Sequence, residues 1–219
     1  MSLFIPIISS ISSGKSTFLK GLLGINELEI GATTTTKFIC LIKNSSKTSF
    51  YHVILKKQGN NVSIQKEGET IENISEIKKK IEELNKKFDI KKGTKDEIFY
   101  MMERPIKNFN NKEILDSCIF MDIPGLNEKK STYLEDIFSI ITLNNILFQI
   151  VIFDSQYLEQ DNMINILKEL DNKRCLKKEG NLYILNKIDC VTTGGENIIE
   201  HFKQYFYRNF EKKIAQIFI

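Results

Sequence analysis

The stretch LFIPIISSISSGKSTFLKGLL, residues 3–23, decides the fold of this 219-residue chain. It opens on an apolar run, residues 3–8, which predicts a buried β-strand. A serine-rich turn containing Gly14 and Lys15 follows, and residues 15–23 have the spacing of a short helix. Such a turn points several backbone N–H groups at one spot, where the helix dipole also favours an anion. The stretch therefore predicts an anion-binding loop between a strand and a helix.

The turn matches the second half of the phosphate-binding motif GxxxxGK[ST], with Ser12-Ser13-Gly14-Lys15-Ser16-Thr17. We expect Lys15 to reach the β- and γ-phosphates of a nucleotide and the Ser16 hydroxyl to bind Mg²⁺. Ser9 replaces the first glycine of the motif, and a serine can make the turn if its φ stays negative. A serine that merely caps the helix start is the alternative interpretation.

Two further motifs follow, each after an apolar strand-like run. Asp122-Ile123-Pro124-Gly125 matches DxxG, in which the aspartate holds Mg²⁺ through water and the glycine amide bonds the γ-phosphate. Asn186-Lys187-Ile188-Asp189 matches NKxD, in which the aspartate accepts two hydrogen bonds from guanine. Its lysine stem lies along the base, and its asparagine ties the loop to the phosphate loop. Because ligands bind at the carboxyl ends of strands in an open α/β sheet, the three motifs predict a guanine-nucleotide site.

Four consecutive threonines, Thr33 to Thr36, precede the second predicted strand. One of them should supply a hydroxyl to Mg²⁺ and an amide to the γ-phosphate. The spacing back from Phe38 favours Thr34, with Thr35 as the second choice. The other threonines are expected to be solvated loop residues.

The rest of the chain alternates strand-like runs with helical periodicity, which predicts an α/β fold with a mostly parallel central sheet. Gly59-Asn60-Asn61 separates two strand-like runs and indicates a hairpin. We expect further strands at residues 38–42, 50–56, 62–65, 98–106, 114–121, 147–153, 181–185 and 214–219. We expect helices at residues 74–88, 131–145, 160–172 and 196–210.

The composition excludes several classes of protein. With 42% hydrophobic and 27% charged residues, the chain is neither disordered, nor collagen, nor a disulfide miniprotein. A net charge of +3 does not favour a nucleic-acid partner. No apolar run approaches the roughly 20 residues that span a bilayer, and the N-terminus lacks the basic region of a signal peptide. We therefore expect a cytoplasmic protein.

The four cysteines, Cys40, Cys118, Cys175 and Cys190, show no CxxC spacing. Their neighbours are apolar or strand-like. We expect reduced thiols in an intracellular protein and no metal site at these residues.

A long insert, residues 43–115, separates the threonines from DxxG, where small Ras-like GTPases have about one hairpin. With this insert, the chain resembles the dynamin family of large GTPases. The residues that carry the resemblance are SSGKST at 12–17, DIPGL at 122–126 and NKIDCVTTGGENIIEHF at 186–202. Residues 72–94 and 153–171 also resemble the family, so that the resemblance covers nearly the whole chain.

The resemblance implies a P-loop NTPase three-layer fold, with helices on both faces of the sheet, and the cofactors Mg²⁺ and GTP or GDP. It gives the switch roles to Thr34, Asp122 and Gly125. Nucleotide contacts fall on Ser12, Ser13, Gly14, Lys15, Ser16, Thr17, Gly125, Asn186, Lys187 and Asp189. Catalysis falls on Ser12, Lys15 and Thr34, and Mg²⁺ binding on Ser16, Thr34 and Asp122.

One position departs from the family pattern. Family catalysis uses a phosphate-loop serine that helps bind a monovalent cation, a glutamine just before it, and dimerisation across the nucleotide face. Ser12 matches the serine, whereas Ile11 occupies the glutamine position. Isoleucine neither donates nor accepts a hydrogen bond, so we expect slow hydrolysis or a different trans-acting group. Leu126 follows Gly125, and dynamins likewise have no glutamine there.

We expect residues 1–219 to be one GTPase domain, a fragment or a truncated homologue, because the family's neck helix and helical stalk are missing. The resemblance implies a nucleotide-dependent homodimer, and peripheral membrane association and remodelling through parts absent here. Two alternatives stay open. One is an ATPase of the EH-domain-containing type, which carries NKxD yet binds adenine nucleotides. The other is a nucleotide-binding scaffold with negligible hydrolysis.

We predict that Asp189→Asn shifts the base preference from guanine toward xanthine, because an amide no longer accepts hydrogen bonds from both guanine donors. Titration of the variant with GDP and with xanthosine diphosphate measures the shift. An unchanged base preference would mean that the motif at residues 186–189 does not read the base.

Overall fold

The computed structural model describes residues 2–24, 37–87, 98–107, 111–126, 131–157, 163–177, 180–188, 195–210 and 217–218. The strands in these ranges are β1 Leu3–Ser9, β2 Ile39–Asn44, β3 Ser49–Gln58, β4 Asn61–Ile71, β5 Phe99–Arg104, β6 Cys118–Asp122, β7 Ile150–Asp154, β8 Leu182–Asn186 and β9 Ile217–Phe218. The helices are α1 Lys15–Leu23, α2 Ile74–Lys87, α3 Lys112–Ser117, α4 Ser131–Ile140, α5 Met163–Asn172 and α6 Gly195–Phe210, with short 3₁₀ turns η2 Leu143–Asn145 and η3 Ser155–Tyr157.

All nine of these strands form one sheet, in the order β4-β3-β5-β2-β6-β1-β7-β8-β9. β1 lies parallel to both β6 and β7, and β8 and β9 continue the parallel half. β2 is parallel to β5 but antiparallel to β6, and β3 is antiparallel to both of its neighbours. The prediction of a mostly parallel sheet is confirmed.

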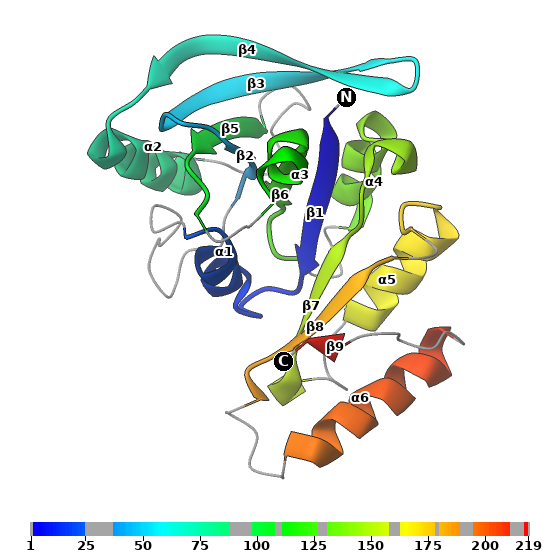
Figure 1. Cartoon of the computed structure of the whole chain (residues 1–219). Coiled ribbons are helices and arrows are strands. Elements are labelled where there is room, and N and C mark those ends of the chain that lie inside the picture. The colour runs from blue at the N-terminus through cyan, green and yellow to red at the C-terminus, as the bar shows by residue number, and fades with distance from the viewer. Residues whose placement is uncertain are drawn as a thin grey trace.

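The sheet is covered on both faces, with α1 and α2 on one side of β1 and α4, α5 and α6 on the other (Figure 1). Side chains alternate across β1, because successive residues of a strand point to opposite faces. Ile5 and Ile7 pack with α1 and α2, whereas Phe4 and Ile8 pack with the opposite core. Two apolar cores thus enclose the sheet, which confirms the predicted three-layer α/β fold.

The segment between β2 and β6 extends the sheet on its antiparallel side. The β3–β4 hairpin is longer than predicted, and its turn contains Gly59 at φ 61°. The hairpin reaches across the molecule, where the Asn145 side-chain amide donates to the Asn60 carbonyl at 3.0 Å. α2 buries Ile77 and Ile81 as its periodicity predicted, although Ile74, its first residue, is 48% exposed. Phe88, the last apolar residue predicted for this helix, lies outside the described residues.

The prediction of a strand over residues 114–121 is wrong in its first half, because Lys112–Ser117 form α3. The Asn111 side chain caps this helix by accepting a hydrogen bond from the Ile114 backbone N–H at 3.2 Å. Of the apolar residues here, Leu115 is buried and Ile114 is exposed, so this segment lacks the continuous burial of β6. The strand begins only at Cys118.

The helix predicted over residues 131–145 ends at Ile140. Thr142 is extended, with φ −68° and ψ 157°, and residues 143–145 form a separate 3₁₀ turn. The Thr142 hydroxyl bonds the Asn145 side chain at 2.7 Å, a local polar contact that competes with continued helix. The predicted strand at 147–153 likewise starts later, at Ile150.

Cys40, Cys118 and Cys175 carry free thiols that are buried, while Cys190 lies outside the described residues. Burial raises the pKa of the Cys40 thiol well above its ordinary value, and the neighbouring Asp122 carboxylate raises it further. A thiol held protonated in this way is a poor nucleophile. Among the helices that the structure describes, none is both long and apolar enough to cross a membrane.

Asn85 on α2 fixes the start of β2, because its side-chain oxygen accepts from the Lys37 backbone N–H at 3.0 Å. Asn85 itself is 2% exposed. We predict that Asn85→Ala lowers the free energy of unfolding by about 1–2 kcal/mol, since the Lys37 N–H loses its acceptor. Urea unfolding measures the change. Lys86→Ala, at an exposed position on the same helix, is the control, and equal effects of the two substitutions would contradict the prediction.

Candidate functional site

The three predicted motifs meet at one edge of the sheet, because each follows the carboxyl end of a strand in its parallel half. The serine-rich loop follows β1, the DxxG motif follows β6, and Lys187 follows β8 (Figure 1). The loops are joined by hydrogen bonds. The Leu126 N–H donates to the Ser9 carbonyl at 2.9 Å, and the Asn186 side-chain amide donates to the Ser13 carbonyl at 2.8 Å. The described parts of the three motifs therefore converge as predicted, while Asp189 lies outside the described residues.

The loop before α1 has an unusual backbone. Ser12 has φ 63° and Gly14 has φ 86°, both in the left-handed region. Ser9 is the last residue of β1 and keeps a negative φ, as its replacement of a glycine requires. The N-cap of α1 is Gly14 and not a serine, and the Ser13 hydroxyl has no partner among the described residues. The alternative of a serine that merely caps the helix is therefore wrong.

Two glycines allow backbones and side chains to meet closely at this edge. A Cβ on Gly14 would lie 2.2 Å from the Asn186 side-chain nitrogen. A Cβ on Gly125 would lie 3.0 Å from the Ile11 Cα and 3.2 Å from the Ile11 nitrogen. The positive φ of Gly14 favours glycine there, and a methyl group would displace the end of the Asn186 side chain. A methyl group at Gly125 would require the Ile11 backbone to shift by a few tenths of an ångström.

Lys15 and Asp122 form a buried ion pair between the first turn of α1 and the end of β6. Lys15 is 7% exposed and Asp122 is fully buried. Removing one member of a buried pair leaves an uncompensated charge, which costs about 3–5 kcal/mol. This ion pair holds the start of α1 and the end of β6 together at this edge of the sheet.

Several buried polar atoms near the ion pair have no hydrogen-bond partner in the part of the chain that the structure describes. They are the second carboxylate oxygen of Asp122 and the hydroxyls of Ser9 and Ser13. Buried polar groups are nearly always paired, so orphaned ones at a loop edge fit a polar ligand. One carboxylate, hydroxyls and a buried ammonium suit a phosphate group with Mg²⁺, a hard cation that prefers oxygen ligands.

At the end of β8, Lys187 has φ 62°, and its ammonium contacts the Asp154 carboxylate at 2.7 Å. Asp154 ends β7 and is directly opposite Asn186 in the parallel register. No motif in the sequence marks Asp154 as a site residue. The sequence shows only that an acidic residue ends the apolar run before the strand that leads into NKxD.

The remaining predicted residues are distributed as follows. Ser16 is half-buried in the first turn of α1, and Ser12 and Thr17 are exposed. Thr34, with Thr33, Thr35 and Thr36, and Asp189 lie outside the described residues.

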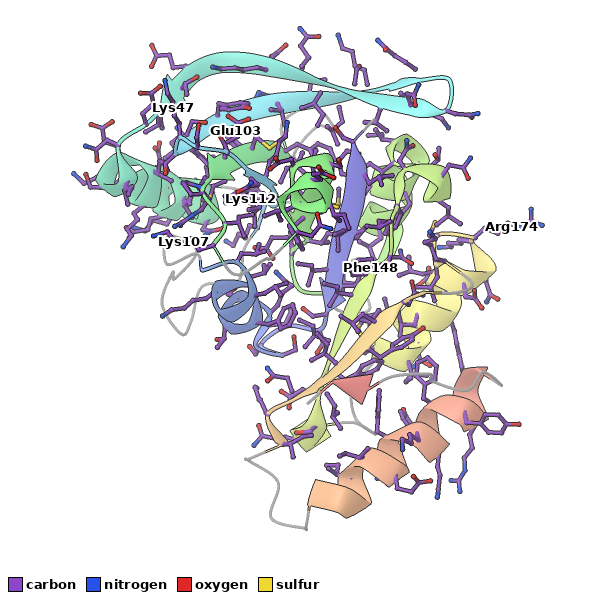
Figure 2. The ribbon with its side chains drawn as sticks, viewed as in Figure 1. Lys47, Glu103, Lys107, Lys112, Phe148 and Arg174 are labelled. Carbon is purple, nitrogen blue, oxygen red and sulfur yellow. The ribbon has the colours of Figure 1, made fainter. Side chains whose placement is uncertain are left out.

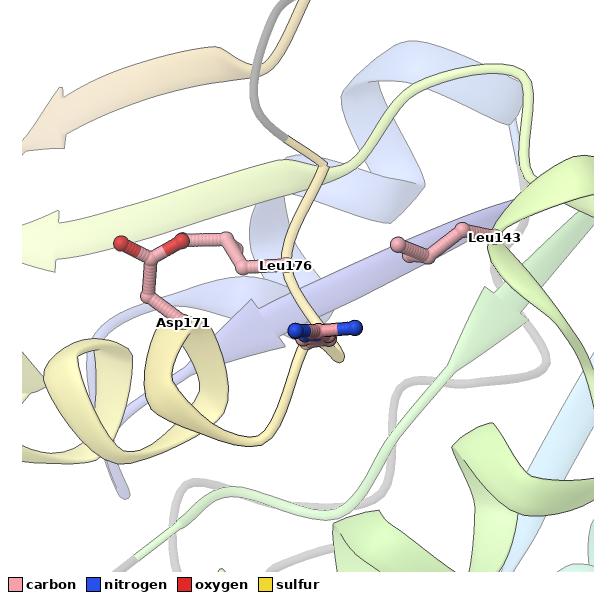
Figure 3. Close-up of a pocket in the computed structure, with 4 residues that line it drawn as sticks. Leu143, Asp171 and Leu176 are labelled. Atoms are coloured by element: carbon pink, nitrogen blue, oxygen red, sulfur yellow. The ribbon is translucent and has the colours of Figure 1, made fainter.

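A separate hollow of about 460 Å³ lies near the amino ends of β7 and β8, at the opposite edge of the sheet (Figure 3). Its described lining residues are Leu143, Asp171, Arg174 and Leu176, and none belongs to the three motifs. Arg174 follows α5 and lies on the opposite side of the view from Lys47 and Lys107 (Figure 2). We therefore place the candidate site at the three motifs and not at this hollow.

The chain matches a known protein family over most of its length. The sequence model of the dynamin family covers residues 5–188. No curated protein matches the sequence significantly.

Two solved structures share the fold, both described as an oligomerised bacterial dynamin pair that provides a mechanism for long-range sensing and tethering of membranes. One is 16% identical with a TM-score of 0.53, and the other is 18% identical with a TM-score of 0.54. Each match covers 99% of this chain and 30% of the solved chain. The chain thus spans less than a third of the length of these structures.

We predict that Gly14→Ala destabilises the protein by about 1–2 kcal/mol or more, because an L-residue is strained at φ 86°. The added methyl group also displaces the Asn186 side chain. Gly21→Ala, on the exposed face of α1 with no atom near the new Cβ, is the matched control and should stabilise by about 0.5–1 kcal/mol. Thermal unfolding of both variants measures the effects. A Gly14→Ala protein as stable as wild type would contradict the close approach.

Proposed function

Because the chain belongs to the dynamin family, we propose that it binds guanine nucleotides with Mg²⁺ and hydrolyses GTP. The observation that carries the proposal is the meeting of three loops at the phosphate loop, where Lys15 pairs with Asp122 and Asn186 bonds the Ser13 carbonyl. The first turn of α1, the end of β6 and the end of β8 each bring one motif there. A phosphate group with Mg²⁺ suits the orphaned oxygens of Asp122, Ser9 and Ser13.

In this proposal, Lys15 binds the β- and γ-phosphates, and the backbone N–H groups of the α1 turn complete the anion site. Asp122 and the Ser16 hydroxyl hold Mg²⁺, with Thr34 as a further ligand. Held by these residues, Mg²⁺ would supply positive charge beside the phosphates. Thr34 and Gly125 respond to the γ-phosphate, so that its loss releases both loops.

In this proposal the base binds near the end of β8, on the side of the phosphate loop away from β6. Asn186 ties that loop to the end of β8 through the Ser13 carbonyl. We assign the base itself to Asp189, whose carboxylate accepts from the two guanine donors, and to Lys187, whose stem lies along the base. An adenine-binding ATPase of the EH-domain-containing type would share the phosphate loop and differ in the partner of Asp189.

Ile11 favours slow turnover. Its side chain is apolar and 38% exposed at the phosphate loop, in the position where the family has its catalytic glutamine. Ser12, in the left-handed conformation beside it, is the proposed contact for a monovalent cation. A nucleotide-binding scaffold with negligible hydrolysis is therefore the second candidate function.

We also propose that the chain is one GTPase domain with an insert at residues 43–115, and that it dimerises with nucleotide through the face that carries Ile11. The support is the self-association of the structural neighbours, which are described as an oligomerised pair that tethers membranes. We further propose that the protein acts in the cytoplasm at a membrane surface, since the structural neighbours are described as tethering membranes.

We predict that Lys15→Ala abolishes GDP and GTP binding and phosphate release, because the phosphates lose their buried cation. Titration of nucleotide-stripped protein by calorimetry, followed by a phosphate-release assay on the same sample, measures both. Lys56→Ala on β3, an exposed lysine away from the site, is the control.

Because Lys15→Ala leaves Asp122 without its partner, circular dichroism must show that the variant folds. Ser16→Ala removes one hydroxyl and tests the same site with little risk to folding; its nucleotide affinity should lose its dependence on Mg²⁺. Unchanged affinity in a folded Lys15→Ala protein, or unchanged Mg²⁺ dependence in Ser16→Ala, would contradict the proposed site.

A further inference from the structure

Asp154 is a buried carboxylate outside the three motifs whose two oxygens are both used. One oxygen contacts the Lys187 ammonium at 2.7 Å, and the other accepts from the Gln156 backbone N–H at 3.0 Å. Asp154 is 4% exposed, whereas the Lys187 side chain is 28% exposed. The ammonium is therefore held by a fixed and shielded partner, unlike the surface pairs of the protein, which contribute little.

The fold dictates this pairing. The parallel register of β7 and β8 sets Asp154 beside Asn186, so Lys187 leaves the sheet at the end of β7. Lys187 then adopts φ 62°, a conformation that L-residues rarely take. With the backbone turned in this way, the side chain lies back toward β7 and reaches Asp154.

We propose that Asp154 is a positioning residue for base recognition, which holds the Lys187 stem in the place where the base binds. This inference rests on the proposed function. A free lysine side chain loses much rotational freedom when it packs against a ligand, and that loss weakens binding. Anchoring the ammonium at Asp154 removes this freedom before the nucleotide arrives.

The arrangement separates the base contacts from the phosphate contacts. Asn186 bonds the phosphate loop through Ser13, and this bond does not involve Asp154. The Lys15–Asp122 pair lies on the other side of β1, at the end of β6. Loss of the Asp154 charge therefore weakens the binding of a nucleotide base and leaves the binding of phosphates unchanged.

The test titrates the nucleotide-stripped full chain, in Mg²⁺, with GDP and with tripolyphosphate, which has phosphates and no base. D154N should weaken GDP binding about tenfold, with tripolyphosphate binding within about twofold of wild type. K187M should weaken GDP binding to the same extent. The double variant D154N/K187M should bind GDP no more weakly than K187M alone, because both substitutions remove the same ion pair. D116N is the matched control, since Asp116 is an exposed, hydrogen-bonded carboxylate on α3.

Three results would overturn the inference. They are an unchanged GDP affinity in D154N, an equal loss of GDP and tripolyphosphate binding, and additive effects in the double variant. If D154N fails to fold, K187M probes the same pair from its more exposed side, and an unchanged GDP affinity there is equally decisive. Wild-type protein that binds tripolyphosphate but not GDP would instead overturn the proposed guanine site, and this inference with it.

Discussion

The Lys15 ammonium is buried in the first turn of α1, and the rest of the site depends on how its charge is balanced. Transfer of an unpaired charge out of water is too costly for a folded protein to tolerate. In the structure the Asp122 carboxylate balances it, which joins α1 to the end of β6. A bound phosphate would supply the same charge and free the carboxylate for a metal ion. Such binding would link the ligand to the position of the β6 loop.

The parallel half of the sheet brings the loops together around the Lys15–Asp122 pair. β6, β1, β7 and β8 run in one direction, so the loops that follow β1, β6 and β8 end at one edge and within hydrogen-bonding distance. Apolar cores on both faces hold these strands, with Ile7 on one side and Ile8 on the other. The antiparallel strands β3 and β4 lie on the far side of β2 and enlarge the sheet without entering the site.

Much of this arrangement was predictable from the sequence, because strand–turn–helix signals and motif order depend on local residues. The bounds of α1 and the meeting of the three motifs were predicted correctly. The strand predicted to start at Ile114 was wrong in its first half, because Asn111 caps a helix there. The Asp154–Lys187 pair was also missed, because it depends on the register of two strands whose paired residues lie 32 positions apart in the sequence. The acidic residue that ends the apolar run was a local signal, but it does not identify Lys187 as its partner.

Competition between nucleotides shows whether these loops form a guanine-specific site. A fluorescent GDP analogue is bound to the wild-type protein in Mg²⁺ and then challenged with unlabelled GDP or with ATP at equal concentration. We predict that GDP displaces the analogue and that ATP does not. Displacement by ATP as effective as that by GDP, or no binding of the analogue at all, would contradict the account.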